Sequence, residues 1–120
     1  MTLRLFLLIL ASVGLSAVAQ LLLKFGTRLA PGERTPAGEL IALLSSPLVL
    51  VGLATYGLGA MLWLFVLARA PLSLAYPFVG LGFILTMVAG LLILGESASL
   101  PRIAGTCLIA LGCVLVARSA

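Results

Sequence analysis

The sequence contains no histidine and no aspartate, and its three acidic residues are all glutamates. Without histidine, the chain can form neither a His-based metal site nor a catalytic triad that includes this residue. Charged residues make up only 8% of the 120 residues, whereas typical globular domains contain roughly 25%. The composition therefore excludes an ordinary soluble domain, and we expect no bound metal.

Cysteine is also scarce. Cys107 and Cys113 lie six residues apart in an apolar run, so on a helix their side chains point in different directions. We expect both to be small buried apolar residues rather than a disulfide or a metal-binding pair.

Apolar residues, in contrast, are abundant, at 63% of the chain. A soluble chain of this length would bury only about two thirds of the surface that its unfolded form exposes, so much of this apolar surface must face lipid. The net charge of +4 comes from basic residues scattered singly near the ends of apolar segments. This pattern is typical of anchors that flank membrane spans and not of a nucleic-acid-binding patch, so the expected surroundings are membrane lipids.

Four apolar stretches divide the chain. A span of about 20 residues crosses the roughly 30 Å hydrocarbon core, and continuous apolar runs indicate helices rather than the alternating strands of a barrel. We predict an all-α membrane protein with one four-helix transmembrane domain over residues 1–120. The expected spans are about 3–29, 46–69, 72–94 and 101–118, with a short amphipathic helix at 38–45 in the membrane interface. The first run stays apolar beyond Ala17-Val18-Ala19-Gln20, which favours a span over a cleaved signal peptide.

Polar residues recur every fourth position in the first span, at Ser12, Ser16, Gln20 and Lys24. This spacing places them on one helix face. Serine can bond back to the preceding turn, but glutamine and lysine need other partners inside a membrane. We therefore expect Ser16, Gln20 and Lys24 to line a substrate-binding cavity. The alternative for Lys24 is that its side chain extends to the lipid headgroups.

Three aromatic residues extend the candidate site. Tyr56 and Trp63 are seven residues apart and so share a face of the second span, and each has a polar tip that requires a partner in lipid. In the third span, Tyr76 precedes Pro77, which leaves a carbonyl near Ser73 without its helical donor and predicts a kink.

No glutamate lies within the apolar core of a span. Glu96 follows the third span. We expect it to cap the fourth helix near its positive end or to pair with Arg102, with a functional role as the alternative.

In the fourth span, Gly105 and Gly112 share one face and allow close helix contact. We predict that they form a dimer interface, and the alternative is packing within the four-helix unit. The two ends of the spans carry three and four basic residues. This near-balance leaves the membrane orientation open, and with it a homodimer or a heterodimer with a related subunit.

Three motifs together resemble a known family. They are Leu15-Ser16-Ala17-Val18-Ala19-Gln20 with Lys24, then Leu62-Trp63-Leu64-Phe65-Val66-Leu67 leading to Ala75-Tyr76-Pro77, and Gly95-Glu96 with the Gly105 and Gly112 pair. The chain resembles the small multidrug resistance–like branch of the drug/metabolite transporter superfamily, and within it the 4-amino-4-deoxy-arabinose–phosphoundecaprenol flippase subunits. The resemblance implies a protomer that dimerises through its fourth helix and forms a substrate cavity from its first three.

The resemblance also suggests the cargo. Multidrug exporters of this group use a glutamate midway along the first helix, and aligning Lys24 with the family's lysine places Ser16 at that position. A serine cannot exchange protons at physiological pH, which argues against proton/cation exchange. The resemblance thus implies a bacterial inner-membrane flippase for a polyprenyl-phosphate-linked aminosugar, with the phosphate near Lys24. Such transport breaks no bond and needs no cofactor, so we expect no enzyme. The alternatives are an exporter of polyamines or lipophilic cations and a non-transporting subunit of a membrane enzyme.

Overall fold

The computed structural model describes residues 2–29 and 35–119, and its regular structure there is helical. Four helical segments are long and apolar enough to cross a membrane, which confirms the predicted four-span architecture. The elements in chain order are α1 (Leu3–Leu29), α2 (Pro36–Leu44), α3 (Pro47–Leu67), α4 (Leu72–Ala75), the 3-10 turn η1 (Tyr76–Phe78), α5 (Val79–Leu92) and α6 (Leu100–Arg118).

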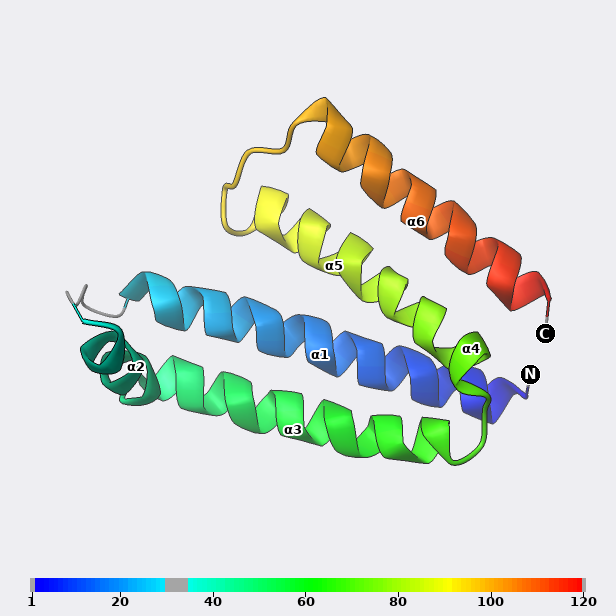
Figure 1. Ribbon diagram of the computed structural model, residues 1–120, viewed down its shortest axis with the longest axis horizontal. Coiled ribbons are helices and arrows are strands. Elements are labelled where there is room, and N and C mark those ends of the chain that lie inside the picture. The colour runs from blue at the N-terminus through cyan, green and yellow to red at the C-terminus, as the bar shows by residue number, and fades with distance from the viewer. Residues whose placement is uncertain (1, 30–34, 120) are drawn as a thin grey trace.

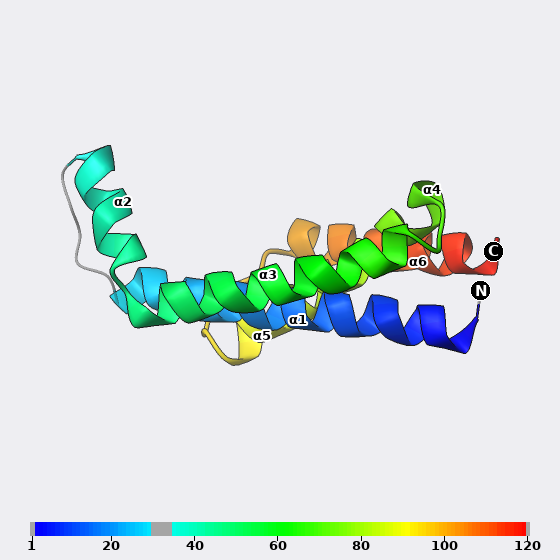
Figure 2. The same cartoon turned by 90° about the horizontal axis from the view of Figure 1, so that it is seen from below.

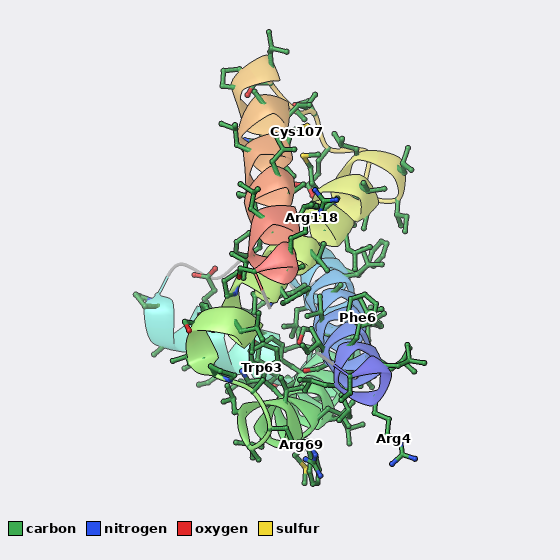
Figure 3. All side chains as sticks on the ribbon, turned by 90° about the vertical axis from the view of Figure 1, so that its right-hand side faces the viewer. Arg4, Phe6, Trp63, Arg69, Cys107 and Arg118 are labelled. Atoms are coloured by element: carbon green, nitrogen blue, oxygen red, sulfur yellow. The ribbon has the colours of Figure 1, made fainter. Side chains whose placement is uncertain are left out.

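The long helices form a row in which α1 lies between α3 and α5, and α6 lies beyond α5 (Figure 1). Both chain ends lie at the same end of the long helices, as four spans require (Figure 1). Figure 3 looks onto this end, where Arg4, Arg69 and Arg118 lie. The loop between α5 and α6 lies at the opposite end (Figure 1). We call these the terminal end and the loop end.

Helix α2 projects away from the row at the loop end (Figure 2). It begins at Pro36, two residues before the expected range, because the Thr35 hydroxyl accepts a hydrogen bond of 3.1 Å from the backbone N–H of Gly38 and so caps the helix. Its apolar residues Leu40, Ile41 and Leu44 are exposed. An interfacial position, with these side chains in lipid, remains a prediction.

The third span is interrupted at Pro77, where the backbone forms the 3-10 turn η1 between α4 and α5. Proline cannot donate the helical hydrogen bond, so the chain narrows to a tighter turn instead of continuing as one α-helix. The thiol of Cys113 in α6 donates a 2.8 Å hydrogen bond to the carbonyl oxygen of Pro77. This contact ties the middle of α6 to the interruption.

The buried core lies near the terminal end. Its centre consists of apolar residues from α1, the end of α3, the connection after α3, and the segment from α4 to η1: Leu5, Ile9, Val13, Val66, Ala70, Ala75 and Phe78. Cys113 is buried, as expected, but Cys107 is exposed. The expectation for Cys107 was wrong because it lies on a face of α6 that no other described helix covers.

Candidate functional site

A cavity of about 740 Å³ lies between α1, α3 and the third span. Each helix presents one face to it, with lining residues three or four positions apart. The α1 face carries Ser12, Ser16, Gln20 and Lys24; the α3 face carries Tyr56, Gly59 and Trp63; the third span carries Tyr76, Val79, Phe83 and Thr86; and Glu96 follows it. The structure therefore brings together all seven residues that the sequence proposed for binding or for a functional role beside it: Ser16, Gln20, Lys24, Tyr56, Trp63, Tyr76 and Glu96. That these residues bind a substrate remains a prediction.

The polar face of α1 divides into a structural and an accessible part. Ser12 is buried, and its hydroxyl donates a 2.8 Å hydrogen bond to the carbonyl oxygen of Gly59 in α3. Ser16 is partly buried, whereas Gln20 and Lys24 are exposed on the cavity wall. From Ser12 to Lys24 the helix rises about 18 Å, so the polar wall covers more than half of the roughly 30 Å hydrocarbon core.

Aromatic side chains form the cavity wall toward the terminal end. The rings of Trp63 and Tyr76 meet edge to face, with centroids 6.4 Å apart and planes at 71°. Trp63 lies between α3 and α4 in the end-on view (Figure 3). Trp63 also packs against the buried core, and this contact holds it at the terminal end of the cavity. Tyr56 lies two helical turns away from Trp63 along α3, on the same cavity wall.

Charged side chains lie toward the loop end. Lys24 precedes the end of α1 by five residues, and Glu96 follows the end of α5. The expectation that Glu96 caps α6 or pairs with Arg102 is not met. Ser99 is the capping residue, because its hydroxyl accepts from the backbone N–H of Arg102 at 3.4 Å. The guanidinium of Arg102 instead donates a 2.9 Å hydrogen bond to the carbonyl oxygen of Ser97.

Two glycines explain why Glu96 faces the cavity. Gly95 has a φ of 68°, in the left-handed region that favours glycine, and it turns the chain back at the end of α5. The N–H of Glu96 then donates a 2.9 Å hydrogen bond to the carbonyl oxygen of Gly90. A Cβ on Gly90 would lie 3.0 Å from Oε1 of Glu96, so the carboxylate occupies the space that a side chain there would fill.

Sequence comparison finds relatives of the chain that are named as flippase subunits. The probable 4-amino-4-deoxy-L-arabinose-phosphoundecaprenol flippase subunit ArnE of Pseudomonas aeruginosa (strain UCBPP-PA14) is 36% identical over 120 residues, which cover all of both chains. The chain belongs to the ArnE family of flippase subunits. The ArnE subunit of Yersinia pestis (strain Pestoides F) is 38% identical over 66 residues, or 55% of this chain and 58% of the relative.

No protein-family model matches the chain, and no solved structure matches it. Membership in the ArnE family together with the four spans makes it a multi-pass transport protein of the bacterial inner membrane. Proteins with this name are subunits, so the family name implies an assembly with at least one further chain.

The resemblance implied that the third span contributes to the cavity, but the sequence did not identify which α5 residues line it. Val79, Gly82, Phe83, Thr86 and Ala89 line it at helical spacing. Their spacing of three and four residues was visible in the sequence, but only Thr86 is polar, and its hydroxyl bonds back to the carbonyl oxygen of Phe83 at 3.1 Å. An apolar face that lines a cavity has the same composition as one that faces lipid, so the pattern could not distinguish them.

Helix α6 contributes no described residue to the cavity wall. A Cβ built on Gly105 or Gly112 meets no described atom outside its own helix within 4 Å. The alternative in which these glycines pack within the four-helix unit is therefore wrong. The open face supports a contact with another chain, and the dimer interface itself remains a prediction.

Proposed function

We propose that this chain is one subunit of a flippase that carries a polyprenyl phosphate bearing an aminosugar across the bacterial inner membrane. One observation carries the proposal: Lys24 stands at the end of a polar wall inside a cavity that three spans form within the membrane. A cation at this position is suited to an anionic lipid headgroup. The family supports the same cargo, because its members are named as flippase subunits for a phosphoundecaprenol-linked aminosugar.

The cavity provides what a lipid headgroup lacks in hydrocarbon. Lys24 offers an ammonium group to the phosphate, while Gln20 and Ser16 offer hydrogen bonds along the next two turns of α1. Trp63 and Tyr76 present polar tips and broad apolar surfaces toward the other end, and Tyr56 adds a further hydroxyl on the α3 wall. The prenyl chain has no need of a polar path and stays in the surrounding lipid. No covalent bond changes, so we propose a transporter and not an enzyme.

The proposed partner is a second four-span subunit, either a copy of this chain or a related one. It would contact α6, whose glycine face is open in the protomer. Close approach of helices through glycine is the usual basis of association where lipid removes the hydrophobic driving force.

Reconstitution into vesicles tests the proposal. Lys24→Ala and Gln20→Ala, each in the complete flippase, are expected to slow translocation of the lipid-linked aminosugar. For Lys24→Ala we expect a loss of tenfold or more, since a charge-assisted hydrogen bond contributes about 1.5–3 kcal/mol. Lys24→Arg keeps the cation and is the matched variant. If both alanine variants translocate the lipid at the unsubstituted rate, the proposed site is wrong.

A cation exporter is the second candidate, because Glu96 brings a carboxylate to the cavity. Against it, Lys24 in the same cavity repels a cationic drug, and Ser16 stands where exporters of the resembled group have their glutamate. Binding of a quaternary ammonium compound separates the two functions. Tight binding that weakens on acidification and is lost in Glu96→Gln would favour the exporter.

A further inference from the structure

Among the described residues that line the cavity, Lys24 and Glu96 are the charged ones, and both lie toward the loop end. We infer that Glu96 recognises the ammonium group of the cargo while Lys24 holds its phosphate, so that the cavity selects a zwitterionic lipid headgroup. This inference rests on the proposed flippase function and assigns a role to a residue that the sequence placed in helix capping.

The position of Glu96 is determined by the backbone around it. Gly95 reverses the chain, and the N–H of Glu96 donates a hydrogen bond to the carbonyl oxygen of Gly90. Because Gly90 has no side chain, the carboxylate of Glu96 has room beside it. Helices α1 and α5 both end at the loop end (Figure 1). Lys24 lies five residues before the end of α1 and Glu96 follows α5, and both residues line the cavity.

The charges of Lys24 and Glu96 match those of the proposed headgroup. A sugar phosphodiester with a free amine carries one negative and one positive charge at neutral pH, so its net charge is zero. Two opposite charges on the cavity wall match the two charges of the headgroup, and each cargo charge gains a partner on leaving water. If the amine is acylated, the headgroup is a net anion, and Glu96 loses its partner and repels the phosphate.

A simpler role for the two residues is that they neutralise each other as an ion pair. This role predicts that exchanging them, as Lys24→Glu with Glu96→Lys, preserves translocation. Recognition of a zwitterion predicts the opposite, because the exchanged charges would meet the wrong ends of a headgroup whose sugar and prenyl chain enter in a fixed direction.

The test compares two lipids in vesicles that contain the complete flippase. One is a polyprenyl phosphate carrying the free aminosugar, and the other is the same lipid with its amine acetylated. We expect the unsubstituted protein to translocate the free amine about tenfold faster or more, and Glu96→Gln to bring the ratio of the two rates close to one. Lys24→Gln should slow both lipids. Glu39→Gln in exposed α2, outside the cavity wall, is the matched control and should keep the original ratio.

Two further variants protect the test from a folding defect. Glu96→Asp keeps the charge and should retain part of the preference. Gly90→Ala leaves Glu96 in the sequence but crowds its carboxylate at 3.0 Å, so it should lower the preference for the free amine without loss of the folded protein. Elution as a single species in detergent and an unchanged melting temperature establish folding for each variant.

The outcomes separate the inference from the function on which it rests. If the unsubstituted protein moves both lipids equally, or if Glu96→Gln keeps the preference, the role of Glu96 is wrong while the flippase stands. If the charge exchange preserves translocation, the two residues serve as an ion pair and the inference fails. If the unsubstituted protein moves neither lipid, the proposed function fails and the inference falls with it.

Discussion

Helices α1 and α6 differ in how much of each the rest of the protomer covers. In α1, 28% of the most hydrophobic 18-residue window is buried within the protomer, whereas in α6 only 6% is. Helices α1 and α3 approach closely where one of them has a glycine: Gly26 lies against Val49, and Gly52 lies against Leu23. The corresponding glycines of α6, Gly105 and Gly112, lie against open space.

Helices α1 and α6 differ in burial although they are almost equally hydrophobic. Mean hydropathy over the best window is 2.3 for α1 and 2.0 for α6, so composition alone does not distinguish them. In lipid, close packing and hydrogen bonds hold helices together. Glycines with a partner therefore mark contacts inside the protomer, whereas Gly105 and Gly112 share a face of α6 that the described protomer leaves open. The variants below are ordered by the expected loss in the free energy of unfolding of the protomer.

Gly26→Ala should have the largest effect. Its Cβ would lie 2.5 Å from Cγ2 of Val49 and 2.9 Å from the backbone nitrogen of the same residue. Because a backbone atom cannot move away without shifting α3, overpacking should cost about 2–3 kcal/mol. The measurement is reversible unfolding in mixed micelles. Gly57→Ala is the matched control, since its Cβ meets no described atom beyond its own helix within 4 Å. Equal stability of the two variants would mean that α1 and α3 do not approach as described.

Gly80→Ala should have the next effect, and it tests the attachment of α6. A Cβ on Gly80 would lie 2.7 Å from Sγ of Cys113 and from Cγ2 of Ile109. Both atoms are at the ends of side chains, so part of the strain relaxes and a loss of about 1–2 kcal/mol is expected. Crosslinking yield between cysteines placed in α5 and α6 should fall along with stability. An unchanged yield would show that α6 is held elsewhere.

Ser12→Ala should have a smaller effect. It removes the hydrogen bond to the Gly59 carbonyl, and such bonds between membrane helices contribute about 0.5–1.5 kcal/mol. Unfolding in mixed micelles measures the loss, and Ser16→Ala is the comparison on the same face. Ser16 lines the cavity and has a proposed role in substrate binding, so this second variant should alter translocation more than stability. A larger loss of stability in Ser16→Ala than in Ser12→Ala would contradict the structural role of the Ser12 hydrogen bond.

The sequence was sufficient for the four spans and for much of the cavity wall. Each span is a continuous apolar run, and four-residue spacing placed Ser16, Gln20 and Lys24 on a shared face that does line the cavity. Such periodicity is a property of one helix, so it survives whatever the other helices do.

What the sequence could not show depends on contacts between segments. Ser12 has the same spacing as Ser16, yet it bonds to α3, because only the packing of two helices decides which serine is buried. The direction of Glu96 follows from a left-handed glycine and from the space over Gly90, and neither is visible as a period. Cys107 and Cys113 differ in burial because they lie on different faces of α6, and among the described residues only the face of Cys113 packs against the third span.

Gly112→Leu should have almost no effect on the stability of the protomer, and it tests the other half of the comparison. The glycine is exposed, and its Cβ would meet no described atom beyond α6 within 4 Å, so a side chain fits without strain in the isolated chain. If the same face holds a second subunit at close range, the added side chain separates the helices and weakens association by tenfold or more, the equivalent of about 1.4 kcal/mol. Val114→Phe enlarges a residue two positions further on, roughly on the opposite side of α6, and is the matched control. Energy transfer between labelled subunits in vesicles measures association, and unfolding in micelles measures the protomer. Loss of association in Gly112→Leu alone would support the glycine face as the dimer interface, whereas equal association of both variants would place the contact on another surface.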